Sequence, residues 1–471
     1  MQKSFAMAAL LAASCGVQAA SDADLAAIRA QIDDMKKTYE QRIASLEKKL
    51  AEAEVQAKSA KPAAEVKAAP AIVAAAPAAT ASARANGFNP EVSLILQGQY
   101  KNMKDVAERG ITGFVPAGGH DEHAAGTVEG INKRGFSVNH TELILGASID
   151  PYWRGQAILA LADGEVEVEE AWFQSLAIGH GVGLKGGRVR SGIGYLNEQH
   201  PHMWDFADAP LMYRAMFGEH ASYAQDGLQF KWLAPTPVFL EFGAEVGRGA
   251  NFPGTDRNKN GAGAGAIFAH IGGDVGHSNA WRAGVSYLKT KASDREAEIE
   301  DTSGKHALGK FTGDSATWLA DFVWKWAPNG NPKYQSFKFQ SEYFVRAEKG
   351  GLNCSSDESS SPCNTAVDST YKTRQSGWYA QGVFKFTPEW RAGVRYEQLD
   401  SGTRDFGLNA NTLVVDSYRP KKASVMVDYS WSEFSRLRLQ LAQDKSMQGI
   451  TDHQLTLQYV MSLGAHGAHK F

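Results

Sequence analysis

The chain has 471 residues, of which 43% are hydrophobic and 21% charged, and its formal net charge at pH 7 is −3. A protein that binds nucleic acid through phosphates needs a concentrated basic surface, so this charge argues against nucleic acid as a partner. Only 3 cysteines are present. The sequence contains no run of about 18 uninterrupted apolar residues, which is the length that a helix needs to cross a bilayer.

Residues 1–20 have the layout of a secretory signal peptide. Lys3 provides a basic start, residues 5–13 form a short apolar run, and small residues come next. Export implies an oxidising compartment, in which Cys354 and Cys363 would form a disulfide within a polar loop. Two free thiols are the alternative.

Residues 22–86 differ in composition from the C-terminal part of the chain. Over 22–58, apolar side chains recur at steps of three or four residues, with Lys, Arg and Glu between them, which predicts an α-helical coiled coil. A lone solvated helix is the alternative, but a helix with so narrow an apolar stripe is marginally stable without a partner. Residues 59–86 are dominated by Ala and Pro, which predicts an extended linker.

From residue 90 to the C-terminus, apolar and polar side chains alternate in segments of about ten residues. In the first segment, Val92, Leu94 and Leu96 share one side of the chain and polar residues hold the other. Side chains of a strand point alternately to opposite faces, so each segment has one apolar and one polar face. The predicted strands are 91–100, 136–149, 153–162, 165–176, 182–190, 226–233, 238–247, 264–272, 281–289, 316–326, 337–347, 376–387, 390–399, 423–431, 435–443 and 453–463.

This pattern predicts an all-β fold, a transmembrane antiparallel β-barrel of about 16 strands over residues 90–471. Short turns alternate with long connectors, which is typical of outer-membrane barrels with both termini in the periplasm. Tryptophans lie near predicted strand ends, as expected at the interface of lipid and water. A soluble β-protein is the alternative, but tryptophans that pack in the core of such a protein would not be concentrated at strand ends. The predicted long connectors are 101–135, 191–225, 290–315, 348–375 and 400–422.

The polar faces of these strands would line a water-filled lumen. Opposed basic and acidic rows create a transverse field, and a modest basic excess would favour anions. The alternative is that facing charges such as Lys338 and Asp321 neutralise each other. The connector 191–225 is rich in apolar and aromatic residues, so we expect it to fold into the barrel as a constriction, or to pack on the outer rim or a neighbouring protomer. The predicted pore-lining and constriction residues are Arg154, Arg188, Arg190, Lys231, Arg282, Lys338, Arg391, Arg395, Asp205 and Asp208.

His200 and His202 flank a proline in this connector and are the candidate metal ligands. Neutral imidazole binds zinc well, although adjacent histidines in a loop are more often solvated. No other cofactor is expected. The chain lacks a Gly-x-Ser-x-Gly elbow, a His-Glu-x-x-His helix and a phosphate-binding Gly-rich loop, so we predict that it is not an enzyme.

Three short motifs carry a family resemblance: the Gly-Gly-Arg-Val-Arg-Ser-Gly-Ile-Gly run that begins at Gly186, the Asn-Glu-Gln-His at Asn197, and the Asp-Ala-Pro-Leu at Asp208. The chain resembles the phosphate-selective porin O/P group over residues 90–471. The resemblance implies a trimeric outer-membrane porin with Arg188 and Arg190 near the eyelet. The chain also looks like barrel proteins labelled zinc-regulated TonB-dependent outer membrane receptors, but such a receptor needs a plug domain and a 22-stranded barrel.

Together, these features predict a bacterial outer-membrane porin, with its N-terminal region in the periplasm, that lets small hydrophilic solutes or ions diffuse passively with a mild anion preference. We expect a homotrimer, formed through the coiled coil and the barrel in contact with membrane lipid. One alternative is a zinc-regulated receptor for metal uptake. Another is a structural barrel that tethers the envelope.

Overall fold

The computed structural model describes residues 90–464, apart from 107–108, 115–132, 139, 163–164, 219 and 416. The predicted signal peptide (1–20), coiled coil (22–58) and linker (59–86) lie outside the described residues. Among the helices that are described, none is both long and apolar enough to span a membrane.

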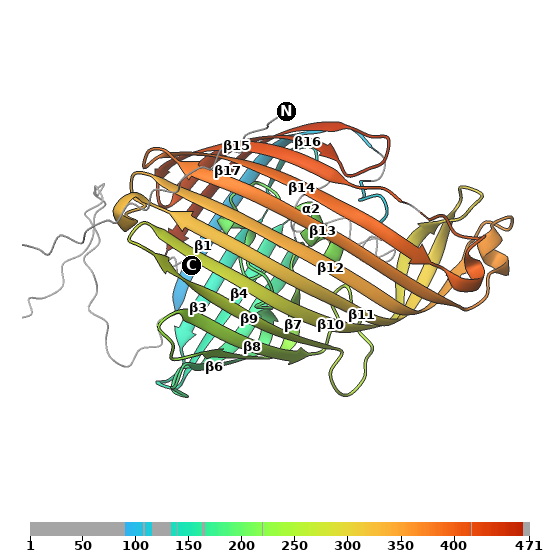
Figure 1. Cartoon of the computed structure of the whole chain (residues 1–471), viewed down its shortest axis with the longest axis horizontal. Coiled ribbons are helices and arrows are strands. Elements are labelled where there is room, and N and C mark those ends of the chain that lie inside the picture. The colour runs from blue at the N-terminus through green and yellow to red at the C-terminus, as the bar shows by residue number, and fades with distance from the viewer. Residues whose placement is uncertain are drawn as a thin grey trace, which may run out of the picture. The chain divides into compact units, whose positions relative to one another are not determined.

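The described strands form one closed antiparallel sheet (Figure 1). From β3 onward each strand pairs with the next strand in the chain, and β1 closes the sheet by pairing with β17 on one side and with β2 and β3 on the other. The strands are β1 (Glu91–Asn102), β2 (Gly135–Val138), β3 (Thr141–Ser148), β4 (Trp153–Ala162), β5 (Glu165–Ser175), β6 (Val182–Arg190), β7 (Ala224–Leu233), β8 (Phe239–Gly247), β9 (Ala264–Val275), β10 (Asn279–Glu300), β11 (His306–Trp326), β12 (Ser336–Ser355), β13 (Ser369–Lys385), β14 (Trp390–Asp405), β15 (Lys421–Ser432), β16 (Ser435–Lys445) and β17 (Asp452–Gly464).

These 17 strands occupy sixteen positions around the wall. The strands β2 and β3 lie end to end along β1, because Gly98–Lys101 of β1 pair with β2 and Glu91–Ile95 pair with β3. The prediction of a closed barrel of about 16 strands is therefore confirmed.

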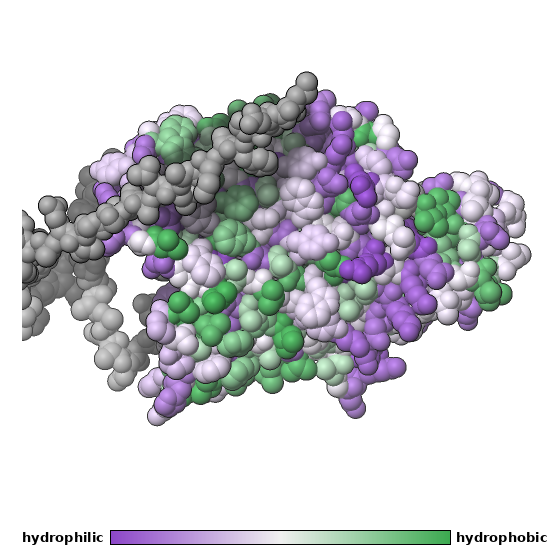
Figure 2. All heavy atoms as spheres, in the orientation of Figure 1, coloured by the Kyte–Doolittle hydropathy of each residue, from purple (hydrophilic) through white to green (hydrophobic). Residues whose placement is uncertain are grey.

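The strands are apolar on the outside of the wall. Figure 2 shows hydrophobic residues gathered on the viewed face, while hydrophilic residues become frequent toward the end to which β10–β14 project. Trp318 and Val394 are each 60% exposed although both are large and apolar. Such side chains are costly to leave in water, so this surface is suited to lipid. Others on the outer face are Val285, Phe322, Tyr343, Tyr396, Val425, Leu441, Leu457 and Tyr459.

The prediction of long loops is wrong for most of 290–315, for about half of 348–375 and for the two ends of 400–422. Strands β10, β11 and β12 have 22, 21 and 20 residues, while β13 begins within 348–375 and β14 ends within 400–422. In the projecting parts the two faces reverse their polarity: Lys291 is exposed on the outside, while Ala292 and Phe311 are buried inside. A strand needs an apolar outer face only where the wall contacts lipid. The sequence pattern that predicted the strands therefore stops where the wall extends beyond the lipid.

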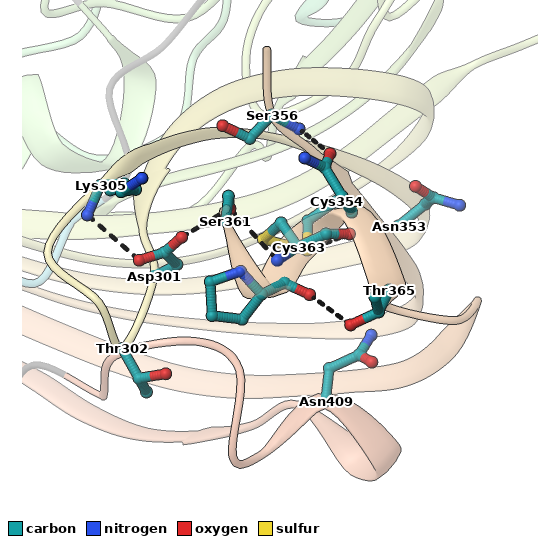
Figure 3. Close-up of a disulfide and its surroundings, with 12 residues drawn as sticks. Asp301, Thr302, Lys305, Asn353, Cys354, Ser356, Ser361, Cys363, Thr365 and Asn409 are labelled. Carbon is teal, nitrogen blue, oxygen red and sulfur yellow. Dashed lines mark hydrogen bonds between the residues drawn. A yellow bond between two sulfur atoms is a disulfide. The ribbon is translucent and has the colours of Figure 1, made fainter. Parts of the chain in front are cut away.

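The projecting ends have their own small core, closed by a disulfide between Cys354 and Cys363 (Figure 3). Both cysteines are buried beside Phe311, Tyr371 and Phe406. Figure 3 also shows Asp301, from the turn after β10, whose carboxylate accepts a hydrogen bond from the Ser361 hydroxyl at 2.6 Å.

Replacing both cysteines with Ser should destabilise this projecting core without opening the barrel. Closing a loop of this length contributes about 3 kcal/mol by restricting the unfolded chain. We expect limited proteolysis to cut within residues 355–368 far faster in the double Ser variant than in the parent. Equal cleavage rates, or loss of the folded barrel on an unboiled gel, would contradict this expectation.

Candidate functional site

Residues 191–223, here called the internal segment, lie inside the barrel and not on its outer rim. The segment leaves β6 and returns at β7, and it contains the short helices η2 (Pro201–Met203) and α2 (Leu211–Phe217). Nearly all of its side chains are buried. Because it hydrogen-bonds to β8, β12, β14, β15 and β16, it reaches most of the circumference of the wall.

Glu342 of β12 anchors the first part of the internal segment. Its carboxylate is buried and accepts hydrogen bonds from the Tyr195 backbone N–H at 2.5 Å and the Tyr213 hydroxyl at 3.1 Å. The Tyr379 hydroxyl of β13 donates to the same carboxylate at 2.7 Å. Gly194 makes this approach feasible, because its φ is +67° and a Cβ there would lie 2.7 Å from Glu342 Oε1.

Two aspartates fix the middle of the internal segment to cationic wall residues. Asp208 lies 2.7 Å from an Arg395 guanidinium nitrogen and 2.5 Å from Lys422 Nζ. Asp205 contacts Lys338 and lies 2.9 Å from Arg391.

Both carboxylates are held in the charged form. Burial alone would raise the pKa of Asp208, but Lys422 and Arg395 hold that pKa well below its usual range. Lys338 and Arg391 likewise lower the pKa of Asp205 against the effect of burial. The internal segment is therefore docked by paired buried charges.

The other side of the internal segment packs by apolar contact. Met212, Met216 and Phe217 of α2 are buried in one cluster with Leu319 of β11 and Phe344 of β12. The Phe217 and Phe344 ring centroids are 5.5 Å apart. A polar lumen was predicted, but at this level the part of the wall around β11–β14 faces an apolar core, because the internal segment supplies the side chains that fill it.

The structure brings most of the predicted basic residues to the internal segment. Arg188 is an exception, since it pairs with Asp226 at 2.8 Å on the exposed part of β6 and β7. Arg154 is another and pairs with Glu91 at 2.6 Å. The residues that contact the segment are Arg190, Lys231, Arg282, Lys338, Arg391 and Arg395.

The alternative in which Lys338 and Asp321 face and neutralise each other is not what the structure shows. The register places Lys338 opposite Lys325 and Asp321 opposite Glu342. Like charges thus face each other across β11 and β12, and the Lys338 charge is balanced by Asp205 of the internal segment. Sequence reasoning could find the polar parity of these strands, but not which wall charges meet the segment.

His200 and His202 lie at the wall beside carboxylates. His200 Nδ1 is 2.9 Å from Glu169 Oε2, and His202 Nδ1 is 2.8 Å from Glu142 Oε1. The alternative that these histidines are solvated is not what the structure shows, because both are buried. Sequence reasoning missed His140, which precedes β3 and lies within the same cluster.

Comparison with known proteins gives one relative by sequence. A protein of Aquifex aeolicus (strain VF5), described as uncharacterized, is 31% identical over 414 residues, which make up 82% of this chain and 80% of the relative. The chain belongs to the same family as this Aquifex protein. No family model matches the chain.

Several solved structures are similar to this chain over most of its length. OmpTdeltaL8, a loop L8 deletion mutant of the Vibrio cholerae outer membrane protein OmpT, is 11% identical with a TM-score of 0.49, covering 80% of this chain and 100% of its own. OprB of Pseudomonas putida is 13% identical with a TM-score of 0.44, covering 80% and 94%. The outer membrane channel DcaP of Acinetobacter baumannii is 12% identical with a TM-score of 0.44, covering 80% and 98%. Likenesses this weak carry no argument about function.

Proposed function

We propose that the chain is a bacterial outer-membrane channel through which small hydrophilic solutes or ions diffuse passively. The observation that carries the proposal is the closed wall, apolar outside and rich in charged groups inside. A closed barrel leaves no unpaired strand edge, so it can lie in lipid with its backbone hydrogen bonds satisfied. The internal segment would act as the filter, because it crosses the path that a solute must take.

A mild anion preference is part of this proposal. Three arginines, of which Arg346 is buried and the other two are partly buried, donate to backbone carbonyls of the internal segment and not to carboxylates. The nearest carboxylates of two of them are more distant, with Arg346 3.9 Å from Glu348 and Arg436 4.0 Å from Asp428. A positive excess along the path favours anions. These donor and acceptor pairs are Arg282 with Gly194, Arg346 with Met216, and Arg436 with His202.

Planar-bilayer recording tests the channel proposal directly. We expect the purified full chain to give stepwise conductance increases in KCl, with a reversal potential displaced toward that of chloride under a salt gradient. Folded protein that inserts but passes no current would refute the proposal. A reversal potential displaced toward that of potassium would refute the anion preference alone.

A structural barrel remains the second candidate, because of the apolar core between the internal segment and the wall. In that case the internal segment would be a permanent plug, and the bilayer experiment would show insertion without current. We further propose that the chain forms a homotrimer through residues 22–58 and the barrel. Mass measurement in detergent, with and without those residues, tests this assembly.

A further inference from the structure

A buried cluster of histidine and glutamate side chains lies where the internal segment meets β3 and β5. His140 precedes β3, Glu142 lies in β3, Glu169 lies in β5, and His200 comes from the internal segment. Each of the four offers one ligand atom, and these atoms lie within 4.8 Å of one another. His140, Glu142 and Glu169 belong to neighbouring parts of the wall, and His200 joins them because the internal segment folds back onto it.

The distances between the imidazole nitrogens and the carboxylate oxygens, 2.8–3.5 Å, are close to those between ligands of one small cation. Nitrogen and oxygen ligands about 2.0–2.1 Å from zinc are about 3.3 Å apart from each other. His140 Nε2 lies 2.8 Å from Glu142 Oε1 and 3.5 Å from Glu169 Oε1. His200 Nδ1 lies 2.9 Å from Glu169 Oε2 and 3.4 Å from Glu142 Oε2.

Unpartnered atoms in the cluster provide an independent observation. His140 is fully buried, and within the described structure its Nε2 contacts Glu142 and Glu169 without hydrogen-bond geometry, while its Nδ1 makes no hydrogen bond. Glu142 Oε2, also fully buried, has no hydrogen bond there either. Buried polar atoms of this kind normally have a partner, so lone pairs that converge without one point to a cation.

The carboxylates of the cluster also carry a negative charge that has to be balanced. Glu142 and Glu169 are joined by a third carboxylate, Glu170, whose Oε2 lies 3.5 Å from His200 Nε2. The nearby guanidinium is that of Arg190, 3.0 Å from Glu169. Buried carboxylates must be balanced, by a metal ion or by protons on the imidazoles.

The geometry points to a binding site for a divalent first-row metal ion, of which zinc is the type, with His140, Glu142, Glu169 and His200 as ligands. Imidazole and carboxylate ligands suit such ions. His202 is not a ligand in this arrangement. Its Nδ1 lies 2.8 Å from Glu142 Oε1 and orients that carboxylate. The ion would attach the beginning of the internal segment to the wall. The inference does not depend on whether the barrel conducts.

Metal binding to the full chain in detergent tests this assignment. We expect wild-type protein to retain about one equivalent of Zn²⁺ per chain after dialysis, and Co²⁺ to give visible absorption bands of a low-coordinate site. The variant His140→Gln/His200→Gln should lose both signals. The matched control His180→Gln/His277→Gln removes two exposed histidines and should lose neither. His202→Gln should weaken binding by roughly tenfold without abolishing it.

Two outcomes would overturn the assignment. One is wild-type protein that is folded, as judged by migration on an unboiled gel, but retains no Zn²⁺ and gives no Co²⁺ bands; protons alone would then balance the carboxylates. The other is equal metal retention in the two double variants. The wild-type Co²⁺ spectrum decides the question even if the variant without His140 and His200 does not fold.

Discussion

Removing the internal segment should raise the single-channel conductance roughly threefold or more, because a barrel of sixteen wall strands without it leaves a wide aqueous channel. The wall permits this deletion. The backbone N–H of Ser191 donates to the Tyr223 carbonyl at 2.9 Å, and Arg190 pairs with Ala224. Residues 192–222 can therefore be replaced by Asn-Gly, which closes a two-residue hairpin between β6 and β7.

The measurement compares conductance steps of the deletion variant and the parent under identical salt. A variant lacking residues 258–261, an exposed connector between β8 and β9, serves as a control and should conduct like the parent. If the parent and the deletion variant give the same conductance, the internal segment is not the constriction. Current through the deletion variant alone would instead identify the segment as a plug and support the structural alternative.

Strand positions could be predicted well where the wall faces lipid. The predicted ranges 153–162 and 182–190 coincide with β4 and β6. The alternation of apolar and polar side chains did not identify the strands beyond the part of the wall that faces lipid. Lys291 and Ala292 show why: they still alternate, but the apolar side chain now points inward.

The candidate site could be predicted only in part. The apolar composition of residues 191–225 correctly indicated that this connector is buried, but it left open whether the connector packs inside the barrel or on its rim. Its anchors could not be assigned, because Tyr195 and Glu342 are 147 residues apart and meet only through the order of strands around the wall. The same reason explains why His140 was missed. Nothing in the sequence around it indicates that it lies beside His200.

Replacing Asp208 with Ala should release the middle of the internal segment from the wall. Arg395 and Lys422 would lose a carboxylate at 2.7 Å and 2.5 Å while remaining buried. Removing one partner of a buried ion pair costs about 3–5 kcal/mol. We expect the lower end of that range, because Glu397 and Asp444 still lie near these cations.

The expected result is a channel that opens more often to a higher conductance and an internal segment that chymotrypsin cuts. The variant Asp208→Asn removes the charge of the side chain but keeps its size. It retains a side-chain oxygen that can accept from Gln440, which donates to Asp208 at 2.8 Å in the parent, but it cannot balance Lys422. Its conductance and cleavage rate should lie between those of the parent and Asp208→Ala. If both variants behave like the parent, the apolar packing of Met212 and Phe217 alone holds the segment in place, and the paired charges at Asp208 contribute only to orientation.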